Sequence, residues 1–503
     1  MKAAISAVMG VIWILLIGCA GTTIRNETDP FSRDREAAFF FNRLERVIET
    51  YGVSDASGFP VPGFPYLRTN RFLAAMKARV LDSDSAVYWA GQMLKLDLAS
   101  RRKELANLPP AAIMEISGAE GDAVDRDTIY RKTETYALRL FHDDRTHPDF
   151  LERLKEAVSV PSEYSGMARF FGLYPLAGIP VTIGTAMAYG RYEDWHRTSL
   201  TDFVDDGRRV RFFPEKPDPA VDPALMGRLF DPQNLDAFGL PVLTRLEEKL
   251  LAHRFAPVIH QDLVRDYDRI GRIFWRDNHV RVDPGQPSAY FYVSHTFLNG
   301  RAMLQLNYAF WYSERAGPNA PWMERGPLDG LSYRVTLDGT GKPVMADIMN
   351  NCGCYYFFVP RKDIVAKIVT KPGEIAPLVP TWLPEAFPDR PLNLRVNSGW
   401  HQVQKVFTDD GSSTGIPYAL VPYETLESLP KGDGRSESVF SPAGIMKTSW
   451  RIEPMIFFSM GIPDIGYMRQ RGHHAIKMVG RRHFTDPDLY DSSFLFKDVV
   501  EKP

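Results

Sequence analysis

The chain has 503 residues, of which 44% are hydrophobic and 12% aromatic, so it is long enough for two domains that each bury a core. Its 60 basic and 62 acidic residues leave a formal net charge of −2, which argues against nucleic acid as a partner because nucleic-acid binding usually requires a basic face. Only 3 cysteines occur, so there is no disulfide framework and stability must come from packing.

A short apolar leader opens the chain. Met1-Lys2 precedes an uncharged run that ends at Cys19 and is short for a membrane-spanning helix. The stretch Leu16-Ile17-Gly18-Cys19 resembles the lipobox of a bacterial lipoprotein signal peptide. This resemblance implies that residues 1–18 are removed and that Cys19 is acylated, which anchors the protein because each buried methylene contributes about 0.8 kcal/mol. The alternative is an ordinary secretory leader with a chance cysteine.

The residues after Cys19 bear on location. Ala20 stands where similar lipoproteins that stay in the inner membrane have an aspartate. The resemblance therefore predicts a lipid anchor in the outer membrane, with the protein facing the periplasm. Residues 19–32 are polar, and we expect them to be a tether between the lipid and the fold.

Residues 33–200 are predicted to be mainly helical. Apolar residues recur at helical spacing over Ala37–Tyr51. Further helices are expected over about Ser85–Ala106 and from about His147.

The stretch Phe170–Tyr189 has no charged residue and is rich in small and apolar ones. Its prolines and glycines argue against a membrane-spanning helix, because they interrupt backbone hydrogen bonding that lipid cannot replace. We expect a buried irregular segment. The alternatives are a wall of an apolar ligand pocket and a loop that dips into the membrane surface.

Residues 251–503 are predicted to be β-rich and antiparallel, after a linker-like segment at 201–250. Short runs of strand-forming residues lie within Tyr290–Val359, separated by glycine, proline and asparagine. Asp338-Gly339-Thr340-Gly341 is a hairpin signal, and strand-like sequence returns at Ile456–Phe458. The whole pattern predicts an α+β fold, with a mainly helical N-terminal part followed by the β-rich part.

The usual short catalytic motifs are absent: the sequence has no HExxH, no GxSxG nucleophile elbow joining a strand to a helix, no P-loop and no GxGxxG after a strand. Cys352 and Cys354 are the remaining thiols, and in an extended segment they would lie side by side, since residues two apart face the same way. We interpret them as structural thiols or a disulfide. A redox pair and two thiolate ligands of a metal such as zinc remain open, although C-x-C spacing is a weak metal signal.

Eight of the 11 histidines follow residue 250, in the part with the short strands. Histidine titrates near neutral pH and binds metals, so these residues are candidates for a site. Asp329, before a glycine, is expected to serve a turn. The candidate catalytic or ligand-binding residues, of which at least three are expected to approach one another, are His295, Asp347, His401, His473 and His474.

Three further stretches, Gly326–Leu331, Asn351–Cys354 and Gly472–His474, are similar to uncharacterised envelope lipoproteins of Gram-negative bacteria. This resemblance implies no activity and no catalytic residue. The favoured function is a membrane-anchored envelope lipoprotein with a binding or structural role. The alternative is a hydrolase of an envelope component, in which histidines and Asp347 hold a metal that lowers the pKa of a bound water to about 7.

Overall fold

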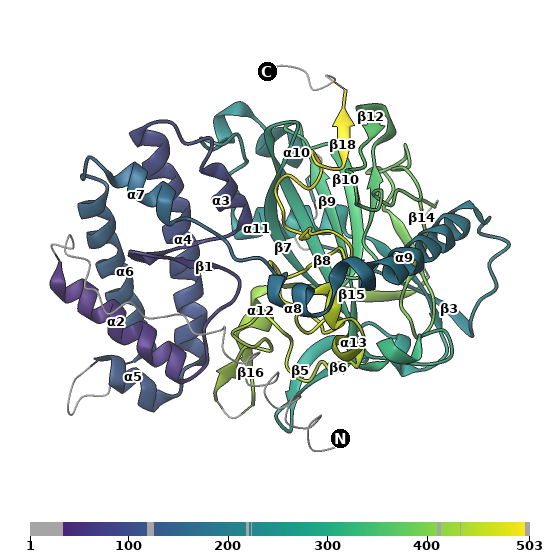
Figure 1. Ribbon diagram of the computed structural model, residues 1–503, viewed down its shortest axis with the longest axis horizontal. Helices are drawn as coiled ribbons and strands as arrows, with labels where there is room; N and C mark the ends of the chain where they lie inside the picture. The colour runs from purple at the N-terminus through teal and green to yellow at the C-terminus, as the bar shows by residue number, and fades with distance from the viewer. Residues whose placement is uncertain are drawn as a thin grey trace.

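The computed structural model has a helical part and a sheet-containing part, seen at the left and right of Figure 1. Helices gather in the N-terminal part and a large sheet in the C-terminal part, so the predicted α+β fold is confirmed. The leader, Cys19 and the tether lie outside the described residues. The structure describes residues 34–117, 125–217, 221–222, 224–409, 414–432 and 434–497.

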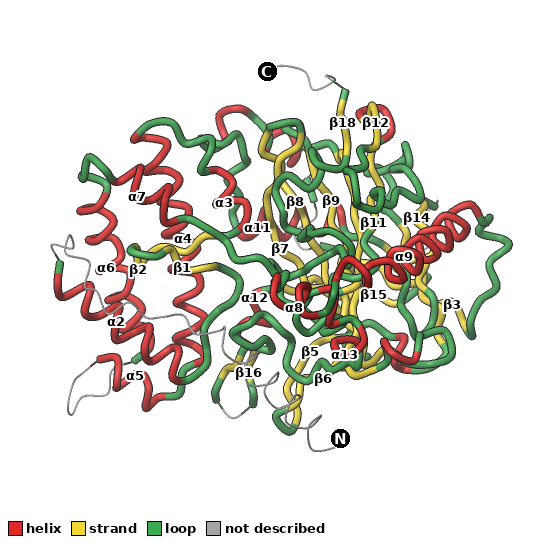
Figure 2. The backbone as a smooth tube through the Cα atoms, in the orientation of Figure 1, coloured by secondary structure: helices red, strands yellow, loops and turns green. Residues whose placement is uncertain are grey.

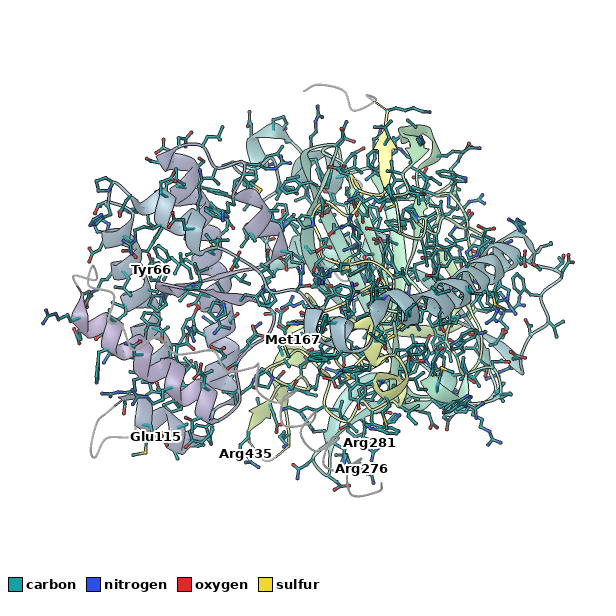
Figure 3. All side chains as sticks on the ribbon, in the orientation of Figure 1. Tyr66, Glu115, Met167, Arg276, Arg281 and Arg435 are labelled. Carbon is teal, nitrogen blue, oxygen red and sulfur yellow. The ribbon has the colours of Figure 1, made fainter. Side chains whose placement is uncertain are left out.

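The helical part has a core of its own. Helix α2 (Arg35–Thr50) begins where the Asp34 side chain accepts a hydrogen bond from Ala37 N at 3.0 Å, and it buries the apolar face that the sequence predicted. Tyr66, labelled in Figure 3, donates its hydroxyl to Asp144 at 2.6 Å and so ties a strand of this part to a helix. The other elements are β1 (Phe59–Val61), β2 (Phe64–Thr69), α3 (Arg71–Met76), α4 (Ser83–Asn107), α5 (Pro110–Ser117), α6 (Arg126–Asp144) and α7 (Phe150–Ala157).

The helices predicted over Ala37–Tyr51, over Ser85–Ala106 and from about His147 are thus confirmed as α2, α4 and α7. In α2 and α7 the apolar spacing matches the face that the helix buries, whereas the second half of α4 also buries Asp97, Arg101 and Glu104.

A ten-stranded mixed sheet forms the centre of the C-terminal part. Its strands are β3 (Arg208–Pro214), β4 (Val258–Leu263), β7 (Ser288–Leu298), β8 (Arg301–Arg315), β9 (Gly326–Leu337), β10 (Pro343–Asn350), β11 (Phe357–Pro360), β13 (Asn393–Val396), β14 (Val403–Phe407) and β15 (Ile416–Pro422). Their order is β11-β10-β9-β8-β7-β15-β3-β4-β13-β14. Strands β7 to β11 are antiparallel, as predicted, whereas β15 runs parallel to both of its neighbours and β13 runs parallel to β4.

Smaller elements surround this sheet, as the tube in Figure 2 shows. The hairpin predicted at Asp338–Gly341 joins β9 to β10, where Asp338 N donates to Lys342 O at 2.9 Å. The smaller elements are α10 (Leu225–Leu229), α11 (Arg245–Phe255), β5 (Arg272–Arg276), β6 (His279–Asp283), β12 (Val365–Ile368), α12 (Glu424–Glu427), β16 (Leu429–Pro430), β17 (Ser436–Glu437), α13 (Glu453–Ile456) and β18 (Phe494–Phe496).

Two boundaries differ from the prediction. The segment 201–250, expected to be linker-like, contributes β3 to the interior of the sheet, between β15 and β4. The stretch Ile456–Phe458, expected to be a strand, closes α13 and begins the 3₁₀ helix η5 (Phe458–Met460). Short apolar runs fit a strand and a buried helical turn equally well, which explains the second error.

The prediction for Phe170–Tyr189 is wrong. This stretch is not an irregular buried segment but the end of α8 (Gly166–Phe171) and most of α9 (Tyr174–Arg197). Pro175 lies in the first turn, where its missing N–H leaves no bond unmade. Pro180 is exposed, so water can reach the carbonyl that its ring leaves unpaired.

Both helices belong with the sheet part rather than with the helical part. The Arg169 guanidinium donates to Met460 O at 2.9 Å and to Gly480 O at 2.7 Å. Gly172 packs so closely on η5 that a Cβ there would lie 2.5 Å from Ser459 Cα. In Figure 1, α9 crosses in front of the sheet part. Among the described residues, no helix combines the length and apolar character that a bilayer crossing needs.

Candidate functional site

A cavity of about 530 Å³ lies between α9 and the segment that follows α13. Its charged lining residues are Glu324, Glu453 and Lys477, and the exposed residues Pro180 and Gly184 lie at its mouth. A mainly apolar wall with a few charged groups is typical of a binding site for an apolar small molecule. The apolar wall includes Ala177, Val181, Ala188, Leu378, Ile462 and Met478.

Helix α9 presents two different apolar faces. Ala177, Val181 and Ala188 recur at helical spacing and line the cavity. A second row faces solvent, with Leu176 66% and Met187 69% exposed. Side chains this large are rarely exposed side by side on a soluble protein, and such patches mark protein or membrane contacts. The exposed row begins at the end of α8 and continues into α9. It is called the outer face below and consists of Phe170, Phe171, Leu173, Leu176, Ile179, Ile183 and Met187.

Cys352 and Cys354 reach the cavity from the turn between β10 and β11. Gly353 between them has φ +93°, and a Cβ there would lie 2.4 Å from Ala475 O, so the turn requires glycine. Cys354 N lies 3.4 Å from Cys352 Sγ. The thiols are close together, as predicted, but a turn brings them together and not an extended strand. Both are free, which agrees with structural thiols, one of the two favoured interpretations, and not with the other, a disulfide.

Asn351 fixes this turn to the sheet. Its Nδ2 donates to Phe310 O at 3.0 Å, and its backbone N–H donates to Gly330 O at 2.9 Å. Gly330 has to be small, because a Cβ there would lie 2.0 Å from Asn351 Nδ2. The two thiols are therefore held by a turn that is bonded to both β8 and β9.

A chain of five buried ionic side chains leads from Asp268, in the 3₁₀ turn that follows β4, to the cavity wall. His401 Nε2 lies 3.4 Å from Asp268 Oδ1, and His401 Nδ1 lies 2.8 Å from Asp329 Oδ2. Arg315 holds Asp329 with two bonds of 2.8 and 2.9 Å and donates to Glu324 Oε2 at 2.6 Å. Glu324 lines the cavity, so the chain ends there.

Aromatic groups enclose this ion chain. The Tyr312 ring stacks on His401 with 3.9 Å between ring centroids and 1° between planes. At the other end, Tyr355 Oη and Trp400 Nε1 donate to Glu324 at 2.5 and 2.9 Å. Each charge is therefore buried with several partners, which is the condition under which buried ions persist.

Burial and pairing shift the pKa values in opposite directions. Burial alone would raise the pKa of Asp329, but Arg315 and His401 hold it well below its usual range. Burial lowers the pKa of His401, yet bonding to Asp268 and Asp329 outweighs burial and raises it. The two carboxylates therefore favour the protonated, cationic form of His401.

The groups at the cavity show a second pattern. A hydrogen bond from the Cys354 side chain and the charge of Arg315 lower the pKa of Cys352 to about 7 despite its burial. The same hydrogen bond raises the pKa of Cys354 well above its usual value. Burial, together with the negative charges of Cys352 and Glu324, raises the pKa of Glu453 to about 8. The cavity thus holds one thiol whose pKa is lowered, one whose pKa is raised and a carboxyl group whose neutral form is favoured.

Arg451 adds a second buried cation near Cys352. Its guanidinium donates to Pro327 O at 2.8 Å and to Leu328 O at 2.5 Å, and in the described part of the chain no carboxylate forms an ion pair with it. Its positive charge interacts with Cys352 and Glu453. Arg451 therefore favours a thiolate at Cys352, while Asp329, which interacts with both groups, opposes it.

Asp347 and His295 lie away from this cavity's ion chain. The Asp347 carboxylate is held by Arg334 at 2.9 and 2.5 Å and by the Tyr356 hydroxyl at 2.8 Å. His295 packs beside Phe72, with 5.3 Å between ring centroids, and lines a separate cavity of about 300 Å³. The partners of Asp347 satisfy its buried carboxylate from neighbouring elements, and the contact of His295 with Phe72 is ring packing.

The two adjacent histidines differ: His473 is hydrogen-bonded through both ring nitrogens, whereas, over the part of the fold that is described, neither ring nitrogen of the buried His474 has a hydrogen-bond partner. His473 Nδ1 lies 2.9 Å from Glu163 and its Nε2 donates to Ala56 O at 2.7 Å, so it joins the sheet part to the helical part. His474 is buried with its ring centroid 6.2 Å from that of Phe484. Of the five predicted site residues, only His401 belongs to the ion chain that ends at the cavity.

No hydrogen bond or ion pair joins any two of these five described residues, and that at least three of them share one ligand stays a prediction. Across the ranges that the structure describes, no group of three or more His, Cys, Asp or Glu side chains is placed to hold a metal ion. Asp329 does not serve a turn: it is fully buried in β9 between Arg315 and His401.

Sequence reasoning missed three carboxylates of the site. Asp268 and Glu324 lie in 3₁₀ turns and Glu453 lies in α13, in three separate segments of the chain. No spacing links them, so only the folded chain brings them together. The available signals were the arginines of the β-rich half, of which Arg315 proves to be central.

No known family provides a further guide: no protein-family model, no curated protein and no solved structure matches this chain.

Proposed function

We propose that the protein is an envelope lipoprotein, anchored in the outer membrane through Cys19 and facing the periplasm, that binds the acyl chain of a lipid in the cavity beside α9. The observation that supports a binding role is the pairing of this mainly apolar cavity with an exposed apolar helix face on the same element. A ligand that leaves a bilayer would meet the outer face first and the cavity mouth next.

The size and lining of the cavity agree with this role. Its volume of about 530 Å³ falls in the range of about 300–1,000 Å³ that is usual for small-molecule sites. A bound chain would contact mostly carbon, and each methylene removed from water contributes about 0.8 kcal/mol. The metal-assisted hydrolase has no comparable support, because its proposed ligands contact different partners.

Filling the cavity mouth should abolish binding. Gly184 lines the cavity, and a Cβ there meets no atom within 4 Å, so a side chain can start from this position and Gly184→Phe is expected to place its ring in the cavity. The ring displaces several methylenes of a bound chain, and we expect the affinity for a fluorescent fatty acid to fall at least about 100-fold.

Gly190→Phe is the matched control, since Gly190 is on the same helix, has equally open space and does not line the cavity. It should bind the fatty acid as the unchanged chain does. Equal affinities for both variants, measured by fluorescence titration, would show that the fatty acid binds elsewhere.

A further inference from the structure

Two thiols with different properties share the proposed lipid cavity. Both line it, both are free, and Gly353 holds them in one tight turn. A nucleophilic thiol needs a positive environment, and Cys352 has Arg315 and Arg451 nearby. A second thiol in contact with the first is what a two-electron oxidation needs in order to end in a disulfide.

Glu453 supplies a proton donor in the same cavity. It is buried, it lines the cavity, and a Cβ on Gly466 would lie 1.9 Å from its Oε2, so its carboxyl group is closely packed in place. The charges of Cys352 and Glu324 act on it. Because these neighbours are negative, they favour the protonated acid over the carboxylate.

We propose that Cys352 and Cys354 form a dithiol that reduces hydroperoxides carried on acyl chains in this cavity. This inference rests on the proposed function, because the acyl chain brings the oxidant to the thiols. It assigns Cys352 as the attacking thiolate, Cys354 as the thiol that closes the disulfide and Glu453 as the acid.

The reaction balances in two steps. Cys352 Sγ attacks the terminal oxygen of the hydroperoxide, so that an S–O bond forms, the O–O bond breaks and the departing alkoxide takes the proton of Glu453. The products are a lipid alcohol and a sulfenic acid on Cys352. Cys354 Sγ then attacks Cys352 Sγ: the S–S bond forms, the S–O bond breaks, and the hydroxide leaves as water with the Cys354 proton. Sulfur loses two electrons and the hydroperoxide gains two, and Glu453 recovers from solvent the proton that Cys352 released. A reducing dithiol then restores both thiols.

The test is one turnover of the full-length Cys19→Ser chain, reduced with dithiothreitol that is then removed. One equivalent of linoleic acid hydroperoxide should yield one equivalent of the alcohol and an intact chain lighter by two hydrogens. Cys354→Ser should stop at the sulfenic acid, which dimedone traps, and Cys352→Ser should not react. The reaction should be on the order of 100-fold faster than that of the urea-unfolded chain, because the thiolate fraction and the acid both contribute.

The pH profile distinguishes a proton donor from a structural carboxyl group. The rate should rise as Cys352 ionises, with its pKa of about 7, and fall as Glu453 loses its proton, with its pKa of about 8. Glu453→Gln should lower the maximum by about 100-fold and remove the fall at high pH. The charged and titratable groups that act on these two are Tyr192, Arg315, Glu324, Asp329, Cys354 and Arg451.

Two substrates separate this inference from the proposed function. Gly184→Phe should block the linoleic acid hydroperoxide and leave hydrogen peroxide reactive. Rapid oxidation of Cys352 by hydrogen peroxide but not by the lipid hydroperoxide would overturn the assigned substrate. The proposed dithiol reaction is wrong if the folded chain reacts with both oxidants no faster than the unfolded chain. This result would count whether or not the chain binds fatty acid.

Discussion

Replacing His401 with asparagine should lower the free energy of unfolding by about 3 kcal/mol at about pH 6. The change removes a cation that is fully buried between Asp268 and Asp329 and stacked on Tyr312. Both carboxylates stay buried without their shared partner. Leaving a buried charge without its partner destabilises the fold more than replacing the whole ion pair does. His401 has φ +54°, a conformation that asparagine also accepts, so the loss measures the cation and not backbone strain.

The free energy of unfolding that His401→Asn loses should depend on pH in one direction. Because folding raises the pKa of His401 above its ordinary 6.5, the stabilisation is complete below about pH 6.5 and declines as the pH rises through the folded-state pKa. The difference between the unchanged chain and His401→Asn should therefore narrow at alkaline pH, as urea unfolding followed by tryptophan fluorescence would show. His279→Asn, at an exposed histidine, should change stability by less than about 0.5 kcal/mol. A loss at His401 that is constant with pH would mean that the buried histidine is neutral.

The second large effect concerns membrane contact. Ile179, Ile183 and Met187 follow one another at four-residue spacing on the outer face of α9 and are 58%, 59% and 69% exposed. Full burial of such a side chain is worth about 1.5–3 kcal/mol, and glutamate at these positions adds the cost of desolvating a charge. Changing all three to glutamate should weaken binding to phosphatidylethanolamine–phosphatidylglycerol vesicles at least about 100-fold.

The experiment uses the Cys19→Ser background, so that only α9 and not an acyl anchor holds the chain to the vesicle. Labelled palmitate should enter the unchanged chain and not Cys19→Ser. The matched control places three glutamates at Leu81, Leu138 and Leu246, which are exposed away from α8 and α9. The fraction of protein that floats with the vesicles should fall for the α9 variant and not for the control. An equal fall for both would show that added negative charge, and not the outer face, weakens binding.

Local patterns predicted the fold well where one face of an element decides its structure. The apolar spacing of α2 and the hairpin between β9 and β10 are both visible in the sequence, because burial and turn chemistry act over a few residues. The prediction for Phe170–Tyr189 was wrong because it, too, considered only local sequence. Its glycines and prolines are locally unfavourable to a helix, and only its packing on the C-terminal segment, at Gly172 and Arg169, shows that a helix is possible there.

The site was harder to predict than the fold. His401 and the pair Cys352 and Cys354 could be selected by residue type, but the partners that set their charge states come from unconnected segments. Histidine clustering was a poor guide. His473 bonds the sheet part to the helical part, and His474 is buried beside the Phe484 ring. Residue type thus identified some of the titratable groups of the site. The neighbours that shift their pKa values could be identified only from the tertiary structure.

The central claim is that the cavity beside α9 holds an acyl chain. The most direct measurement is photo-crosslinking with a fatty acid that carries a diazirine near its end, followed by mass spectrometry of the labelled peptides. The claim predicts labels on the cavity face of α9, around Val181 and Ala188, and on the wall at Ile462 and Met478. An excess of unlabelled fatty acid should remove the labels, and so should Gly184→Phe. Labels confined to the outer face, or centred on the separate cavity at His295, would contradict it.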